Sequence, residues 1–314
     1  MYLSKPRFWN LKKPNLLSYL LKPFTLPVKL NNLFLKNNNK EKSKKIKTIC
    51  IGNIYIGGTG KTPTVIKLFQ ILKKLKLKVS TGKKYYSSQL DEQILLKKKT
   101  DLIIDHKRSN IIKKAIKRKK DLLVFDDGLQ DRKIHYDLQF VCMDVINWIG
   151  NGCLIPAGPL REETKSLKKY DAVFLKNSLS KNSKFKRYIK KINSEIKIFN
   201  TFYKPLNLKE FSQRNKYLIF SGIGNPDDFK KILSRNKINI VKELVFPDHF
   251  NYDNNDINKI KIEAKKMNAK IITTEKDYVK IPSKNKSGIK FLKIDLTIQN
   301  KKELINFLKL KINE

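Results

Sequence analysis

Residues 46–70 read IKTICIGNIYIGGTGKTPTVIKLFQ, and this stretch decides the predicted fold. Its apolar start, Ile46–Ile51, is typical of a buried strand, and the periodic apolar residues after Pro63 predict a helix. The loop between them is rich in glycine and ends in Lys61 and Thr62. Such a loop can cradle phosphates, because glycines let backbone N–H groups approach and a helix N-terminus favours negative charge. The lysine would neutralise the outer phosphates, and the threonine hydroxyl would reach Mg²⁺.

The predicted nucleotide-binding residues are consecutive in the chain: Gly57, Gly58, Thr59, Gly60, Lys61, Thr62 and Pro63. The common pattern, G-x-x-x-x-G-K-[ST], has a glycine where this chain has Tyr55, so the loop fits a G-G-x-G-K-T variant better. The alternative is a glycine-rich turn with an accidental Lys-Thr pair. The strand and helix in register on either side favour a nucleotide site.

The amino-acid composition limits the kinds of partner that the protein could bind. The 314 residues contain 69 Lys and Arg but only 28 Asp and Glu, a formal net charge of +41. Such a charge suits a nucleic acid, an anionic membrane or an acidic substrate. The excess is mostly lysine spread over the whole chain, which also fits a general composition bias with a solvated surface. Three sparse cysteines without metal-type spacing indicate a reducing compartment.

Alternating strand and helix patterns after residue 46 predict an α/β fold with a mainly parallel sheet. We expect a nucleotide-binding lobe over residues 46–204 and a second, smaller α/β lobe over 205–314. The predicted strands of the first lobe, after the opening one, are Lys99–Ile104, Leu122–Phe125, Leu138–Met143 and Ala172–Leu175, with a helix at Ile111–Lys119. Those of the second are Tyr217–Phe220, Ile238–Phe246, Lys270–Thr273 and Ile289–Ile294, with helices at Asp227–Ser234, Asp256–Met267 and Lys302–Leu310.

Residues 1–45 form a separate, amphipathic segment. Leucines and aromatic residues in Leu16–Leu35 alternate with lysines, a pattern typical of a segment lying in a membrane interface. Packing of this segment on the body of the protein explains the same pattern. Pro23 and Pro27 should break it into short pieces, and no apolar stretch is long enough for a membrane span.

Acidic residues follow the predicted strand at Leu122–Phe125. Asp126 and Asp127 stand where nucleotide enzymes hold Mg²⁺, although acids at a strand end also serve as turn formers. Farther along, the loop GNGCLIPAGPLREE (150–163) contains Arg161 and Glu162. The arginine could stabilise charge on a transferring phosphoryl group and the acid could help to hold the metal, or both could lie on an ordinary surface loop.

A phosphoryl acceptor hydroxyl also needs a base or an orienting group. His249 lies in the sequence FPDHF after a predicted strand, and Asp91 precedes a helical run. Either residue could instead have a structural role, His249 in its loop and Asp91 as a helix N-terminal acid.

Together these residues resemble the tetraacyldisaccharide 4'-kinase family, the lipid A 4'-kinases of Gram-negative bacteria. The matching pieces cover roughly residues 46–281 and come in the family's order: GNIYIGGTGKTP (52–63), DE (91–92), DDGLQ (126–130), GNGCLIPAGPLREE (150–163), FSGIGNPDDF (220–229), FPDHF (246–250) and TTEKDYVKI (273–281). The combination of GGTGKTP, DDGLQ and PAGPLRE is far more specific than the phosphate loop alone.

The resemblance implies transfer of the γ-phosphate of ATP, with Mg²⁺, to the 4'-hydroxyl of a tetraacylated glucosamine disaccharide 1-phosphate, forming lipid IVA. It implies peripheral or monotopic association with the cytoplasmic face of the inner membrane, an anionic surface, and no nucleic-acid partner. The family's base, an Asp acting with a His, maps onto Asp91 and His249, and its loop Arg and Glu map onto Arg161 and Glu162. We expect Asp91 in the first lobe and His249 in the second, so that they meet only when the lobes close.

By the same resemblance the phosphate-loop residues are Lys61 and Thr62, and the metal is held by Thr62, Asp126, Asp127 and Glu162. Arg108 matches a further phosphate-site arginine. The chain departs from the family at STGKKYYSS (80–88), where an arginine-glycine-tyrosine-glycine run is usual and Lys83 or Lys84 could replace the lost charge. It also departs at Asp131, where a histidine is usual.

Three other functions fit parts of the chain. A membrane-cycling ATPase with a deviant loop would have a lysine where Ile56 stands. A nucleic-acid-dependent NTPase fits the charge but would need a basic-aromatic binding face. A nucleotide-binding regulator without activity would not need the complete set of catalytic residues.

Overall fold

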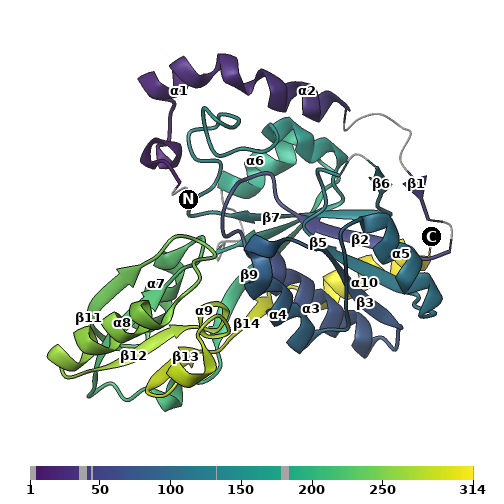
Figure 1. Ribbon diagram of the computed structural model, residues 1–314. Coiled ribbons are helices and arrows are strands. Elements are labelled where there is room, and N and C mark those ends of the chain that lie inside the picture. The colour runs from purple at the N-terminus through teal and green to yellow at the C-terminus, as the bar shows by residue number, and fades with distance from the viewer. Residues whose placement is uncertain (1–4, 35–40, 44, 132, 178–183, 314) are drawn as a thin grey trace. The chain divides into compact units, whose positions relative to one another are not determined.

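The computed structural model describes residues 5–34, 41–43, 45–131, 133–177 and 184–313, and the chain forms two compact units (Figure 1). Among these residues, the larger unit comprises 5–85, 99–202 and 296–313, and the smaller comprises 86–98 and 203–295. Within the described residues, no helix is both long and apolar enough to cross a bilayer.

The larger unit contains a sheet of eight strands in the order β14-β9-β8-β7-β2-β5-β3-β4, and every pair from β9 to β4 is parallel. The predicted α/β class is therefore confirmed. The strands are β2 (Lys47–Gly52), β3 (Val79–Lys84), β4 (Leu102–Asp105), β5 (Leu122–Asp126), β7 (Leu138–Asp144), β8 (Ala172–Lys176), β9 (Lys197–Pro205) and β14 (Ile294–Ile298). Because β2 lies between β5 and β7, the loops after these three strands meet at one edge of the sheet.

Helices cover both faces of this sheet (Figure 1). Apolar residues of α5 (Arg108–Lys117) and α6 (Lys184–Ile192) share one core with one face of the strands. On the other face, Phe307 of α10 (Lys301–Asn313) packs against Phe140 and Phe199. Helix α3 (Lys61–Lys74) contacts β2, β3 and β5. Strands buried on both faces read as apolar runs, and for this reason most of them were recognisable in the sequence.

The smaller unit has its own parallel sheet, in the order β11-β10-β12-β13, with a core on each face. Its strands are β10 (Lys216–Ser221), β11 (Asn239–Val245), β12 (Ala269–Thr274) and β13 (Ile289–Leu292). Its helices are α4 (Leu90–Lys99), α7 (Pro226–Arg235), α8 (Asn254–Lys266) and α9 (Glu275–Tyr278). Shorter elements of the chain are β1 (Glu41–Lys42), β6 (Ile134–His135), η3 (Ser87–Gln89), η4 (Thr164–Lys169), η5 (Leu208–Glu210) and η6 (Ser283–Asn285).

The predicted boundary near residue 205 needs two corrections. The C-terminal residues from 296 onward belong to the larger unit, because β14 joins its sheet and α10 buries Leu304 and Leu308 there. Residues 86–98, predicted in the nucleotide-binding lobe, belong to the smaller unit. Both corrections arise from contacts between parts of the chain that are distant in sequence. Local sequence patterns do not encode such contacts.

The N-terminal segment consists of short helices, as the two prolines predict: η1 (Arg7–Asn10), α1 (Leu16–Leu21), η2 (Pro23–Thr25) and α2 (Leu26–Phe34). Its inner side packs on the larger unit. The Trp9 indole donates to the Pro156 carbonyl (3.0 Å), and the Asn32 amide donates to the Arg161 carbonyl (3.0 Å). Packing on the body, one of the two predicted alternatives, is therefore present.

The outer side of the same segment is apolar and exposed. Its exposed large hydrophobic residues are Leu11, Leu16, Leu17, Tyr19, Leu20, Phe24, Leu26, Leu30 and Leu33, and exposed lysines lie among them. Soluble proteins rarely leave so many large apolar side chains together on one short segment, and such a surface marks an interaction site.

Candidate active site

The phosphate loop has the geometry that its glycines predict. Gly60 precedes α3 with φ +87°, and Gly57 has φ +125°, values that L side chains rarely adopt. Beneath the loop, the amide of buried Asn53 donates to Thr59 Oγ1 at 3.1 Å. The loop therefore leads directly into a helix N-terminus, where backbone N–H groups are available to an anion.

Thr62 and Asp126, both predicted as metal ligands, lie in direct contact. Thr62 Oγ1 donates to Asp126 Oδ2 at 3.0 Å, and the Lys83 ammonium lies 2.8 Å from the same oxygen. Lys83 and Asp126 are neighbours in the pairing of β3 with β5, and their side chains are 1% and 0% exposed. The divergent stretch 80–88 thus places a buried cation beside the predicted metal-side carboxylate.

Asp127 lies where two predicted cationic residues converge. Lys61 Nζ is 3.6 Å from Asp127 Oδ2, and an Arg161 amino group is 3.1 Å and 3.2 Å from the two carboxylate oxygens. Burial by itself would raise the pKa of Asp127, but the charges of Lys61, Arg161 and Lys83 lower it to about 2. Asp127 has φ +60°, so its backbone turns sharply as it leaves β5.

The loop 150–163 reaches the phosphate loop through backbone hydrogen bonds. The Ile56 N–H donates to the Pro159 carbonyl at 2.8 Å, and the Arg161 N–H donates to the Ile54 carbonyl at 2.8 Å. Arg161 is therefore held beside the nucleotide loop by main-chain contacts, which favours the predicted site over an ordinary surface loop with a solvated Arg-Glu pair.

Glu162 is buried, but its contacts are made away from Thr62 and Asp126. It accepts hydrogen bonds from Gln130 Nε2 (2.7 Å) and the Tyr170 hydroxyl (2.7 Å), and Lys169 Nζ lies 2.6 Å from it. Gln130 also accepts a long hydrogen bond from Arg161 (3.4 Å). The carboxylate thus braces the Arg161 loop, and its contact with a metal stays a prediction.

Arg108, at the first position of α5, explains the unusual Asp131. Its guanidinium donates to Asp131 Oδ2 at 2.8 Å and to the Asp127 carbonyl. Burial would lower the pKa of Arg108, and the negative charge of Asp131 is among the influences that raise it. Gly128 between the two acids is required by space, because a Cβ there would lie 2.5 Å from the Tyr136 hydroxyl. Asp131 therefore positions Arg108 at the turn that presents Asp127.

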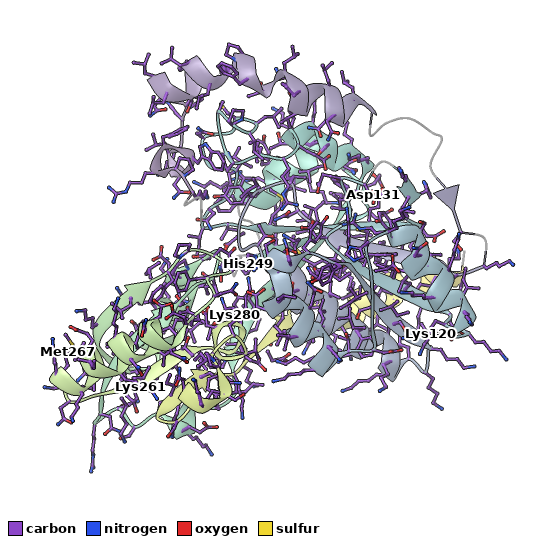
Figure 2. All side chains as sticks on the ribbon, viewed as in Figure 1. Lys120, Asp131, His249, Lys261, Met267 and Lys280 are labelled. Atoms are coloured by element: carbon purple, nitrogen blue, oxygen red, sulfur yellow. The ribbon has the colours of Figure 1, made fainter. Side chains whose placement is uncertain are left out.

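Asp91 and His249 meet within the smaller unit (Figure 2 labels His249). His249 Nδ1 lies 2.9 Å and 3.0 Å from the two oxygens of Asp91, whose side chain is 1% exposed. The expectation that the two residues come from different lobes and meet only on closure is wrong, because α4 belongs to the smaller unit. His249 has φ +62°, a strained conformation for a non-glycine residue that often marks a functional position.

Two lysines of the TTEKDYVKI stretch, neither of them predicted as a site residue, complete this group. Lys276 Nζ and Lys280 Nζ lie 3.6 Å and 3.7 Å from Asp91 Oδ2. Lys280 is also 2.9 Å from Asp277, a fully buried carboxylate. Burial would raise the pKa of Asp91, but the hydrogen bond from His249 and the two lysine charges hold it below its usual value. The available signal in the sequence was their spacing of four residues, which runs from α9 into the turn after it.

The residues present fit a magnesium ion that accompanies a nucleotide. Magnesium in such sites is held by one or two protein oxygens together with phosphates and water. The Thr62 hydroxyl and the Asp126 carboxylate, 3.0 Å apart beside the phosphate loop, supply such oxygens. Among the described residues, no cluster of three or more His, Cys, Asp or Glu side chains forms a metal cage.

Comparison with known proteins gives one consistent result. The family model for tetraacyldisaccharide-1-P 4'-kinase matches residues 16–90 and 82–313. A tetraacyldisaccharide 4'-kinase of Pelagibacter ubique is 47% identical over 314 residues, covering 100% of this chain and 99% of that protein. The corresponding protein of Rickettsia canadensis is 37% identical over 95% of this chain and 94% of its own length.

A solved structure agrees with the fold. The crystal structure of the "apo" form of LpxK from Aquifex aeolicus, in complex with ATP, has a TM-score of 0.73 against this chain. It covers 95% of this chain and 100% of its own, at 20% sequence identity.

Proposed function

We propose that this chain, which belongs to the tetraacyldisaccharide 4'-kinase family, transfers the γ-phosphate of ATP to the 4'-hydroxyl of a tetraacylated glucosamine disaccharide 1-phosphate. The observation that supports it best is the convergence of Lys61 and Arg161 on Asp127 beside the phosphate loop. Phosphoryl transfer needs positioning and charge neutralisation more than covalent catalysis. This group of residues suits that requirement.

On the nucleotide side, the loop N–H groups and Lys61 would bind the phosphates of ATP. Arg161 would neutralise the charge that develops on the transferred group, because its backbone is tied to the loop at Ile54 and its guanidinium lies against Asp127 beside the loop. Both cations lie near Asp127, which holds them beside the phosphate loop.

Thr62 and Asp126 would hold Mg²⁺, directly or through water, with Asp127 and Glu162 as further acids of the site. The ion supplies neutralisation of the β- and γ-phosphate oxygens.

On the acceptor side, Asp91 and His249 would act as a unit. The 4'-oxygen bonds to the γ-phosphorus, the bond from that phosphorus to the β–γ bridging oxygen breaks, and the hydroxyl proton passes to the pair. Because the two side chains share a hydrogen bond, the proton belongs to the pair as a whole. Lys276 and Lys280 keep Asp91 ionised and therefore ready to accept it.

The exposed apolar side of the N-terminal segment would bind the cytoplasmic face of the inner membrane peripherally. Leucines and aromatic residues would enter the interface while the inner side stays packed on the larger unit. An anionic membrane surface suits the net charge of +41. This placement would bring the enzyme to an acylated substrate that resides in the bilayer.

The experiment that tests the activity is product analysis. Purified protein is incubated in detergent micelles with Mg²⁺, ATP labelled at the γ-phosphate and the disaccharide 1-phosphate, with a 4'-deoxy analogue as control. We expect label on the 4'-position of the first lipid and none on the analogue. A folded, ATP-binding protein that labels neither lipid would contradict the proposal and return the nucleic-acid-dependent NTPase as the next candidate.

A further inference from the structure

A second buried ion pair lies beside the phosphate loop, formed by two residues to which the proposed reaction assigns no role. Lys176 and Asp144 are the last residues of β8 and β7, and they are neighbours in the pairing of these strands. Their charged atoms are 2.9 Å apart, and the side chains are 2% and 1% exposed. Burial of two charges is costly, and replacing such a pair by apolar residues is often neutral or stabilising, so stability alone does not account for it.

The lysine of this pair also contacts the loop. Lys176 Nζ donates to the Gly58 carbonyl at 3.2 Å. The carboxylate that holds the lysine is itself fixed, because Asp144 Oδ1 accepts from the Asn177 amide at 3.1 Å and from the Ile146 N–H at 3.0 Å. A chain of hydrogen bonds therefore runs from the ends of β7 and β8 to the backbone of the nucleotide loop.

The contact with Lys176 fixes the Gly58 carbonyl, in the part of the loop whose backbone has the greatest conformational freedom. Gly57 and Gly58 have no side chains that could limit their dihedral angles. The peptide group is planar, so a Gly58 carbonyl directed at Lys176 directs the Thr59 N–H the opposite way. That N–H donates to the Gly57 carbonyl at 2.9 Å, and the Thr59 side chain is held by Asn53. The peptide is thus held on both sides by groups of the protein itself.

We infer that Lys176, held by Asp144, is a positioning residue for the phosphates of ATP. It fixes the Gly58–Thr59 peptide and so reduces the entropy that the loop loses when it closes around the phosphates. This inference rests on the proposed binding of ATP by the loop but not on the identity of the acceptor. It predicts that loss of the pair lowers the affinity for the nucleotide and has little effect on the KM for the acceptor lipid.

The test compares ATP affinity in four proteins: wild type, Lys176→Met, the double variant Lys176→Met/Asp144→Asn, and Lys197→Met. The double variant removes both buried charges, so we expect it to fold even where the single variant is destabilised. Lys197 lies on the neighbouring β9 with an exposed side chain and serves as the matched control. Affinity is measured by calorimetry with Mg-ATP, and kcat and KM are measured for each substrate.

We expect the double variant to bind ATP about tenfold more weakly than wild type and Lys197→Met. Its KM for ATP should rise in parallel, while kcat at saturating ATP and KM for the lipid stay near wild-type values. Wild-type ATP affinity in the folded double variant would overturn the inference and leave the pair a structural one. Wild-type protein that binds ATP but transfers nothing to the lipid would overturn only the proposed function.

Discussion

His249 Nδ1 lies 2.9 Å from Asp91 Oδ1, and both residues belong to one compact unit. The pair is therefore assembled by the fold of the smaller unit alone, with α4 supplying the acid and the loop after β11 supplying the histidine. Lys276 and Lys280 surround the same carboxylate and keep it charged. If this pair activates the acceptor as proposed, it is preorganised by the fold, and the proposal has consequences for pH dependence.

Substitution of Lys276 should shift the pH profile of catalysis. Its charge helps to lower the pKa of Asp91, so Lys276→Met should raise that pKa and move the acidic limb of kcat/KM to higher pH. Lys276→Arg should restore most of the wild-type profile. Rates measured from about pH 3 to 9 test this, with Lys266→Met on the exposed side of α8 as control. An unchanged acidic limb in Lys276→Met would show that Asp91 ionisation does not limit the reaction.

Asp127 should contribute to acid stability in a defined pH window. Its pKa is lowered to about 2 in the folded protein, so its contribution is fully present above the unfolded pKa, about 4. The contribution is lost as pH falls from about 4 toward about 2. Chemical denaturation at several pH values should therefore show that the free energy of unfolding falls less steeply with decreasing pH for Asp127→Asn than for wild type. If the free energy of unfolding fell equally steeply with pH for the two proteins in this window, the predicted ion pairing with Lys61 and Arg161 would be contradicted.

Lys83 should be important for stability because its partner is buried. Lys83→Met leaves the Asp126 carboxylate in the interior without its ammonium, which should cost about 3–5 kcal/mol. Lys83→Met/Asp126→Asn should be distinctly more stable than the single variant. Lys84→Met, at the next position of the strand, is the matched control, and urea denaturation is the measurement. If Lys83→Met and Lys84→Met lose stability equally, the buried pair has no special role.

Exposed leucines of the N-terminal segment should control membrane binding. Leu16→Ser/Leu17→Ser/Leu20→Ser removes apolar surface without touching Trp9, whose indole holds the segment to the body. Sedimentation with vesicles containing anionic lipid should fall at least about tenfold, since each leucine contributes roughly 1.5–3 kcal/mol when buried. Activity on substrate in detergent should persist. Wild-type sedimentation by the triple variant would place membrane contact elsewhere on the chain.

The structural features that depend on local sequence pattern could be predicted. The strand, glycine loop and helix around Lys61 form a continuous motif, and apolar runs reveal strands that are buried on both faces. Strand β9 was not predicted because it begins in a charged region and is only partly buried. Strand β3 was not recognised as a strand because its residues, VSTGKK, are mostly polar.

Long-range contacts could not be predicted in the same way. The assignment of Asp91 to the smaller unit depends on where α4 packs, and the return of α10 depends on Phe307 meeting Phe140 and Phe199. The pairings of Lys83 with Asp126 and of Lys176 with Asp144 follow from strand order and register. A lysine in a strand reads as a solvated residue until its neighbour in the sheet is known.

The most direct test of the account measures phosphate transfer to the 4'-hydroxyl in wild type, Asp91→Ala, His249→Ala and the double variant, together with their ATP affinity. His135→Ala, an exposed histidine of β6, is the control. We predict transfer reduced about 10²–10⁴-fold in each single variant and little further in the double, with ATP affinity and the control unchanged. Transfer at wild-type rates in Asp91→Ala and His249→Ala would contradict the claim that this pair activates the acceptor.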